Sequence, residues 1–193
     1  MSMETALESY PKAVALKSGV SLTLRPLVST DYKALCAFFK ALPSEDLIFL
    51  KERISDPKVI RRWCKKIDHG HTLHLLAFAD KKIVGLASLN QDLGGWKRHI
   101  GRFNVHTLPE YRGKGIGRKM VNEIIDVARQ CGLMWLEAEL FDKQQAAIKM
   151  FGLLGFSNVL CRPGYVKDMQ SVTHDYILMD LKLITEEEYA GTG

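Results

Sequence analysis

The segment Glu110–Met120, EYRGKGIGRKM, contains glycine at positions 113, 115 and 117 together with four cationic side chains. It lies between an apolar run that predicts a strand and a periodic run that predicts a helix. The first four amide N–H groups of a helix have no acceptor within it, and the helix dipole adds about half a positive charge there. Glycine lets the backbone adopt positive φ and approach a ligand closely. The segment is therefore suited to binding an anion, and we expect a pyrophosphate group.

Two common phosphate-binding motifs do not fit these residues. Counted from Gly113, both the Walker A loop and the dinucleotide fingerprint GxGxxG require glycine at position 118, where the chain has Arg118. The pattern that does fit is Arg112-x-x-Gly115-x-Gly117. Glycines at this spacing can also mark an ordinary turn between a strand and a helix, so the loop alone leaves that alternative open.

Several segments of the chain resemble the GNAT superfamily of acyl-CoA-dependent N-acetyltransferases. VHTLPEYRGKGIGRKMV, residues 105–121, resembles its pyrophosphate loop, Gln/Arg-x-x-Gly-x-Gly/Ala. LFDKQQAAIKMFGLLGF, residues 140–156, resembles the later segment in which Asn-x-x-Ala and an aromatic residue precede LGF. LTLRPLVSTDYKAL, residues 22–35, resembles the opening strand and helix, and CAFFKALPSEDLIFLKERI, residues 36–54, resembles the protein-lysine acetyltransferases of the superfamily. The resemblance covers residues 20–183.

The resemblance implies that acetyl-CoA is the cosubstrate and that no metal is required. The strands predicted at residues 98–108 and 133–141 would separate, and the pantetheine arm would bind the unpaired backbone of the first strand, as in β-augmentation. The residues that the resemblance assigns to acetyl-CoA are Val105, His106 and Thr107 on that strand, Arg112, Gly113, Lys114, Gly115, Ile116, Gly117 and Arg118 in the loop, and Gln144 and Phe151 near the last helix.

Two of these positions depart from the family pattern. Gln144 stands where the family has asparagine, and its longer side chain changes the reach of the amide. Phe151 stands where many members have a tyrosine that protonates the leaving thiolate. Because phenylalanine has no proton to give, either water or another group such as Tyr165 supplies the proton, or the thiolate leaves unaided. Phe151 would then pack against the cofactor.

The attacking amine must lose a proton, and a base near it would accelerate the reaction by about 10²–10⁴-fold. Glu137 and Glu139 share one face of a predicted strand, where mutual repulsion would raise one carboxyl pKa toward that of a useful base. The same carboxylates can instead pair with lysines or face solvent. On the preceding strand the candidates are Arg102, Asn104 and His106. Arginine cannot serve as a base, whereas His106 has an ordinary pKa of about 6.5, although strand histidines are often structural. The predicted catalytic residues are Glu139 and His106.

Two other clusters of polar residues are weaker candidates for function. His69, His71 and His74 could supply zinc ligands, but His71 and His74 would point to opposite faces of a strand, so we interpret this segment as the entrance to a hairpin. A basic cluster at residues 61–66 is typical of a solvated helix face. It also gives a weak indication that the acceptor is acidic.

The apolar periodicities predict an α+β domain in which about four helices flank a mixed, mostly antiparallel sheet of about seven strands. The predicted strands are 20–27, 71–79, 83–90, 98–108, 133–141, 156–160 and 172–183, and the helices follow residues 28, 56, 115 and 141. Asp56 and Pro57 are expected to cap the second helix, and Gly132 is expected to end the third. The strand–helix–strand unit across residues 98–141 should be a right-handed crossover with parallel strands. We expect an N-terminal extension at 1–19, the acetyltransferase domain at 20–183 and a C-terminal tail at 184–193.

Composition limits the alternatives. The chain has 193 residues, 47% of them hydrophobic, and a net charge of +5, which suits an anionic ligand but does not by itself indicate a nucleic-acid partner. Its four cysteines are scattered, so neither a disulfide framework nor a cysteine zinc site is expected. With no apolar run of the ~20 residues needed to span a membrane and no signal peptide predicted, we expect a cytoplasmic protein.

The resemblance implies an N-acetyltransferase that moves the acetyl group of acetyl-CoA to a primary amine, on a small molecule or a protein lysine, by direct attack in a ternary complex. The likeness of residues 36–54 to protein-lysine acetyltransferases slightly favours a protein acceptor over a small amine. Backbone N–H groups near residues 105–107 would hold the tetrahedral oxyanion. We expect a monomer or homodimer with no nucleic-acid or membrane partner. The alternative is an acyl-CoA sensor that binds the cofactor but has little catalytic activity.

Overall fold

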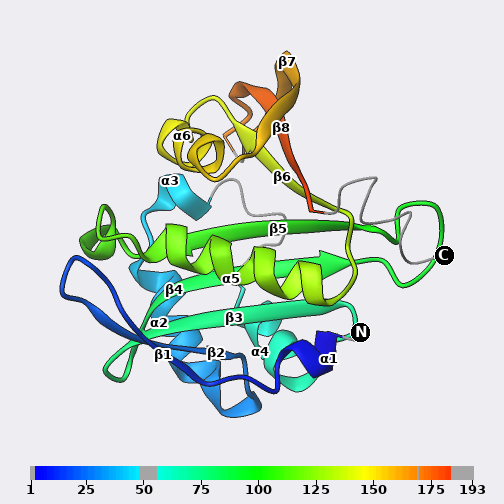
Figure 1. Cartoon of the computed structure of the whole chain (residues 1–193). Helices are drawn as coiled ribbons and strands as arrows, with labels where there is room; N and C mark the ends of the chain where they lie inside the picture. Colours follow the sequence, from blue (N-terminus) through cyan, green and yellow to red (C-terminus); the bar gives the residue numbers. More distant parts are fainter. Residues whose placement is uncertain (1–2, 48–55, 169, 184–193) are drawn as a thin grey trace, which may run out of the picture.

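The computed structural model describes residues 3–47, 56–168 and 170–183. Its strands form one eight-stranded sheet in the order β1-β2-β3-β4-β5-β6-β8-β7 (Figure 1). Every neighbouring pair is antiparallel except β5 and β6, which are parallel. The strands are β1 Lys12–Ala15, β2 Ser21–Pro26, β3 Thr72–Ala79, β4 Lys82–Gln91, β5 Ile100–Thr107, β6 Trp135–Phe141, β7 Ser157–Lys167 and β8 Thr173–Lys182. The predicted fold class is confirmed, with one strand more than expected.

Helices cover both faces of this sheet. The helix α5 lies across β3, β4 and β5 on one face, whereas α2 and α4 pack on the opposite face (Figure 1). The helices are α1 Met3–Ala6, α2 Tyr32–Ala41, α3 Ser44–Leu47, α4 Pro57–Lys65, α5 Ile116–Gln130 and α6 Gln145–Leu153, with 3-10 turns at Ser29–Asp31 and Pro109–Tyr111. None of the helices in the described ranges is both long and apolar enough to cross a membrane.

Local sequence signals set the ends of the two helices nearest the site. At the start of α4, the Asp56 side chain accepts a hydrogen bond from the Lys58 amide at 2.9 Å, and Pro57 occupies the first helical position, where its missing N–H costs nothing. After α5, Gly132 has φ of 75°, and the next amide, of Leu133, donates to the Ala128 carbonyl. This is the glycine-terminated end that the sequence predicts.

The segment predicted as an N-terminal extension takes part in the sheet and the core. In the described part of residues 1–19, β1 pairs antiparallel with β2, and Met3 of α1 is only 1% exposed. The division of the chain at residue 20 stays a prediction. The tail predicted at residues 184–193 and residues 48–55, which follow α3, lie outside the described residues.

A buried carboxylate joins this N-terminal segment to α5. Glu123 accepts hydrogen bonds from Tyr10 Oη at 2.8 Å and Lys12 Nζ at 2.7 Å, and it forms an ion pair with Lys119 one turn earlier at 2.7 Å. Burial by itself would raise the pKa of Glu123, but the hydrogen bonds from Lys119, Lys12 and Tyr10 outweigh it and lower the pKa to about 2. The ionised carboxylate therefore ties the N-terminal segment to α5 more strongly than the protonated acid would.

The strand β7 is longer than predicted. The sequence predicts a strand at residues 156–160 followed by a loop around residues 162–165, but β7 continues through that loop to Lys167. Its pairing with β8 is irregular between Arg162 and Val166. Gly164 adopts φ of 60° there and donates its amide to Asp175 Oδ1 at 2.8 Å. The proline and glycine form a bulge within the strand rather than ending it.

We expect Glu123→Gln to lower the free energy of unfolding at pH 7 by about 2 kcal/mol, because the donors keep an acceptor but lose its charge. The folded pKa of Glu123 lies below its ordinary value, so the ionic stabilisation is present above about pH 4.5 and is lost as the pH falls toward 2. The difference from the unsubstituted protein should therefore shrink at pH 3. Urea unfolding at both pH values measures it, and Glu45→Gln on exposed α3 is the control. An unchanged difference between pH 7 and pH 3 would contradict the prediction.

Candidate active site

The strands β5 and β6 pair over only a few residues and then part. The ladder joins Ile100–Arg102 to Trp135–Glu137, although β5 continues to Thr107 and β6 to Phe141. Beyond this ladder β5 remains paired with β4, and β6 with β8 (Figure 1). The edge of β5 that faces β6 therefore carries backbone polar groups without a strand partner after Arg102, as the resemblance implies.

The glycine loop lies at the end of β5, beside this free edge. Gly115 is the N-cap of α5 with φ of 89°, and no side chain caps the helix. A Cβ atom built on Gly113 or Gly115 meets nothing within 4 Å, so the space in front of the loop is open. On Gly117 such an atom would lie 3.6 Å from the sulfur of Met150 in α6. The unpartnered amides of the first turn of α5 and an open approach fit a diphosphate group.

The cationic side chains of the loop have different surroundings. Arg112 forms an ion pair with Asp46 of α3, and its Nε donates to the Thr107 carbonyl at 3.4 Å. Lys114 lies over the Tyr111 ring at 5.0 Å, and its carbonyl accepts from Ser18 Oγ at 2.8 Å. Arg112 therefore fastens the end of β5 to α3.

Phe151 and Gln144 help to place α6 beside the gap between the strands. Phe151 is 2% exposed and packs against Phe103 of β5 and Phe156, with ring centroids 5.2 and 5.5 Å away. Gln144 is the N-cap of α6, and its Oε1 accepts from the Phe141 amide at 3.3 Å. Phe151 is thus part of the core, and its predicted contact with a cofactor stays a prediction.

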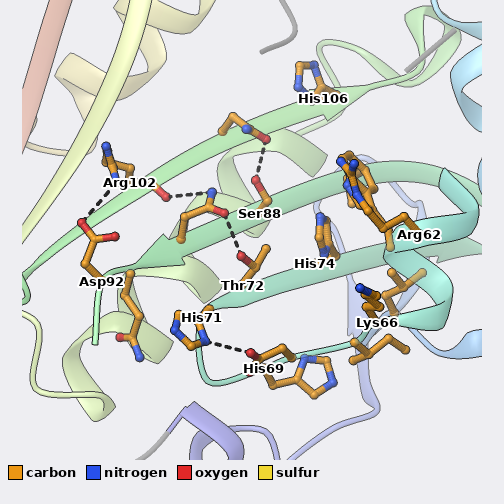
Figure 2. Close-up of a pocket in the computed structure, with 18 of the residues that line it drawn as sticks. Arg62, Lys66, His69, His71, Thr72, His74, Ser88, Asp92, Arg102 and His106 are labelled. Atoms are coloured by element: carbon orange, nitrogen blue, oxygen red, sulfur yellow. Dashed lines mark hydrogen bonds and ion pairs between the residues drawn. The ribbon is translucent and has the colours of Figure 1, made fainter. Parts of the chain in front are cut away.

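A cavity of about 610 Å³ opens on the sheet face covered by α2 and α4 (Figure 2). Its lining combines apolar side chains with cations, carboxylates, amides and imidazoles. The lining residues include Leu27, Phe39, Arg62, Trp63, Lys66, Asp68, His69, His71, Thr72, His74, Leu86, Ser88, Asn90, Asp92, Arg102, Asn104 and His106. The volume lies in the range of small-molecule sites, about 300–1,000 Å³.

The floor of the cavity is built from rows of residues in register across β3, β4 and β5. Paired residues of neighbouring strands lie side by side on the same face. One row joins His74, Ser88 and Asn104. The next rows are Thr72, Asn90 and Arg102 on one side and Leu76, Leu86 and His106 on the other. The register thus collects polar side chains from three strands.

His106 connects the cavity with the free edge of β5. Its backbone belongs to the part of β5 beyond the ladder with β6, and its side chain lines the cavity. Nε2 is buried and has no hydrogen-bond partner among the described residues. Burial lowers the pKa of His106 to about 4, an effect that the nearby Arg112 guanidinium reinforces and the Asp46 carboxylate opposes. The imidazole is therefore neutral at pH 7 and offers an unused polar atom.

Two of the other histidines of the cavity have partners of their own. His74 stacks on Trp63 with ring centroids 4.4 Å apart, and burial lowers its pKa to about 4. His71 pairs with Asp68 at 2.8 Å. Within the ranges that the structure describes, no three His, Cys, Asp or Glu side chains are grouped as metal ligands.

Glu139, the other predicted base, lies away from the cavity. It is exposed on β6, where it accepts a hydrogen bond from Tyr176 Oη at 3.1 Å. Burial, followed by the Glu139 carboxylate, raises the pKa of Tyr176 to about 12. Tyr165 packs against Tyr176 on the same outer strands. The structure therefore brings His106 but not Glu139 to the cavity.

The sequence named Arg102, Asn104 and His106 of β5 as candidates, but the polar residues of β3 and β4 that complete the floor were missed. On β3 the polar residues on this face are Thr72 and His74, and on β4 they are Ser88 and Asn90. On β5 Asn104 lies on the same face, between Arg102 and His106. That alternation in otherwise apolar strands was the available signal, since a polar side chain on a core face needs a partner or a ligand.

Comparison with known proteins gives a consistent family assignment. The profile of the Acetyltransferase (GNAT) family matches residues 36–156. The N-alpha-acetyltransferase RimI of Mycobacterium tuberculosis is 35% identical over 120 residues, which are 58% of this chain and 69% of that relative. The L-amino acid N-acyltransferase MnaT of Escherichia coli K12 is 34% identical over 79 residues, 38% of this chain. That match spans only 44% of MnaT.

The fold also matches a solved structure. The structure of yncA from Salmonella typhimurium, solved with its cofactor acetyl-CoA, superposes with a TM-score of 0.71 at 23% identity. The superposition covers 86% of this chain and 95% of that one. At 23% sequence identity, this structural similarity is evidence for the fold alone.

We expect His106 and His74 to remain neutral down to about pH 5, because burial lowers both pKa values to about 4. Nuclear magnetic resonance titration of the imidazole protons between pH 4 and pH 8 measures this, and His106→Gln and His74→Gln assign the signals. A midpoint above pH 6 for the His106 signal would contradict the buried environment described here.

Proposed function

The chain belongs to the acetyltransferase (GNAT) family, and on this premise we propose that it transfers the acetyl group of acetyl-CoA to a primary amine by direct attack in a ternary complex. The observation that carries the proposal is the position of His106. Its backbone lies on the free edge of β5, where the thioester arm would bind, and its side chain lines the cavity, where the amine would bind. One residue thus faces both reactants.

Acetyl-CoA would be held by backbone groups more than by side chains. The diphosphate would accept hydrogen bonds from the amides of residues 113–118, which the conformation at Gly115 leaves open. The pantetheine arm would extend along residues 105–107, bonding to β5 as an added strand does. Gln144 lies between the end of β6 and the start of α6, and its Oε1 already accepts a hydrogen bond from the Phe141 amide.

His106 would accept the proton that the amine releases. The amine nitrogen attacks the thioester carbonyl carbon, and the nitrogen becomes strongly acidic as the new C–N bond forms. A neutral imidazole of low pKa can therefore take that proton, directly or through a water, even though it is a weak base. The C–S bond then breaks and the electron pair leaves with sulfur. Backbone N–H groups near residues 105–107 would stabilise the oxyanion, each by about 3 kcal/mol.

No side-chain acid is required at the position of Phe151. The ring is buried between Phe103 and Phe156 and carries no transferable proton. In the tetrahedral intermediate, the thiolate is a better leaving group than the deprotonated nitrogen of the acceptor amine. The intermediate therefore collapses toward the amide product. The same feature favours the second candidate, an acyl-CoA sensor without turnover, which the assay below separates from the enzyme.

The assay measures thiol release from acetyl-CoA in the presence of a panel of amines and peptides. We expect His106→Gln to lower kcat by at least about 10²-fold, because it removes the proton acceptor, and to leave the affinity for CoA unchanged. His99→Gln, just before β5 and outside the cavity lining, is the matched control.

Because His106 is neutral above about pH 5, the rate should rise with pH along one limb that belongs to the acceptor amine. A kcat for the His106→Gln variant equal to that of the unsubstituted protein would exclude His106 as the base. Binding of CoA without turnover of any amine would favour the sensor.

A further inference from the structure

The polar floor of the cavity has a chemical preference that goes beyond acetyl transfer to amines in general. We propose that the acceptor is a small amino carboxylate, and that Asn104 and Asn90 bind its carboxylate through their side-chain N–H groups. The orientation of the bound acceptor, with its amine at His106, rests on the proposed function. The preference for a carboxylate rests on the cavity itself.

Neighbouring hydroxyls fix which end of each amide is left for a ligand. Ser88 Oγ donates to Asn104 Oδ1 at 2.9 Å, and Thr72 Oγ1 donates to Asn90 Oδ1 at 3.0 Å. Figure 2 shows these bonds leaving Ser88 and Thr72 along the floor of the cavity. With their oxygens engaged, the amides present their NH₂ groups, which are donors only. The floor therefore calls for an acceptor group such as a carboxylate.

The side-chain NH₂ groups of Asn90 and Asn104 differ in whether they already have a partner. One N–H of Asn90 reaches the Arg102 carbonyl at a long 3.5 Å, so it is a weak internal bond. Asn104 is exposed, and the structure gives its NH₂ group no partner among the described residues. Ser88 beneath it is 6% exposed, so the bond that orients Asn104 is sheltered from water. Asn104 is therefore the principal donor.

The charges around the cavity favour the same ligand. Both lining carboxylates already have partners, since Asp68 binds His71 at 2.8 Å and Asp92 binds Arg102 at 3.3 Å. Arg62 and Lys66, at the end of α4, add two positive charges on the wall that faces the sheet (Figure 2). Among the described residues that line the cavity, three are cationic, Arg62, Lys66 and Arg102, and two are acidic, Asp68 and Asp92, while the histidines with lowered pKa are neutral. A ligand with a carboxylate gains from this potential, and a purely cationic ligand does not.

The spacing of the residues limits the length of the acceptor. His106 and Asn104 are two residues apart on β5, so their side chains share a face at a separation of about 6.6 Å. An amine at His106 and a carboxylate at Asn104 must then be joined through very few bonds, as in an α-amino acid. Leu27, Phe39 and Leu86 line the remaining volume, which would suit an apolar side chain such as that of leucine.

Binding of the reaction products tests the preference without depending on turnover. Calorimetry with the full chain and saturating CoA would compare N-acetyl-L-leucine with N-(3-methylbutyl)acetamide, which lacks only the carboxylate. We expect the carboxylate to improve the affinity at least tenfold. Equal affinity for the two compounds, or no binding of N-acetyl-L-leucine at 10 mM, would overturn the inference.

Substitution of the principal donor tests the assignment to Asn104. We expect Asn104→Asp to weaken N-acetyl-L-leucine at least tenfold by charge repulsion and to change the neutral compound less than twofold. Asn104→Ala, which removes the donor without adding charge, should give a smaller loss in the same direction. Asn158→Asp, the same change on exposed β7, should alter neither affinity. Equal losses for both compounds in the Asn104 variants would overturn the assignment.

Turnover separates this inference from the proposed function. Leucine should be acetylated at least tenfold more efficiently, in kcat/KM, than 3-methylbutylamine or a lysine-containing peptide. Efficient acetylation of the peptide alone would overturn the inference and leave the proposed function standing. The expected binding preference without acetylation of any amine would overturn the proposed function and leave the carboxylate preference standing.

Discussion

The free edge of β5 is the constraint on which the rest of the site depends. One edge of this strand is paired with β4 from Gly101 to Thr107, and that pairing fixes which side chains line the cavity. The other edge loses its partner after Arg102, and it leads directly into the glycine loop. In the proposed function, such a strand would present side chains to one reactant and backbone to the other. The separation of β5 and β6 would then place both reactants without a dedicated domain for either.

Contacts far apart in the sequence keep this arrangement in place. Phe103, Phe151 and Phe156 fill the space beside the parted strands and hold α6 against β5. Glu123 of α5 accepts hydrogen bonds from Tyr10 and Lys12 and so joins α5 to the N-terminal segment. The ion pair between Arg112 and Asp46 connects the loop to α3. Together these contacts act on α3, α5, α6 and β5, the elements that adjoin the glycine loop or the gap.

The sequence was sufficient for the features that depend on local chemistry. Gly115 at a helix start, the Asp56-Pro57 cap and Gly132 after α5 carry their conformational requirements within a few residues, and these predictions agree with the structure. The cavity could not be predicted in the same way, because its floor exists only once three strands are in register. For that reason Glu139 and His106 were equal candidates in the sequence, and only the pairing of β5 with β4 distinguished them. The part played by the N-terminal residues was missed because β1 is short and half-buried.

The central claim is that the amides at the start of α5 bind the diphosphate of coenzyme A. The most direct measurement is a calorimetric titration of coenzyme A into the unsubstituted protein, the Gly115→Val variant and the Gly95→Val variant. Both glycines have φ near +80° to +90° and open space around them, so both changes strain the backbone alike. The account predicts at least tenfold weaker binding for Gly115→Val and unchanged binding for Gly95→Val. Absence of binding to the unsubstituted protein, or equal affinity in all three, would contradict it.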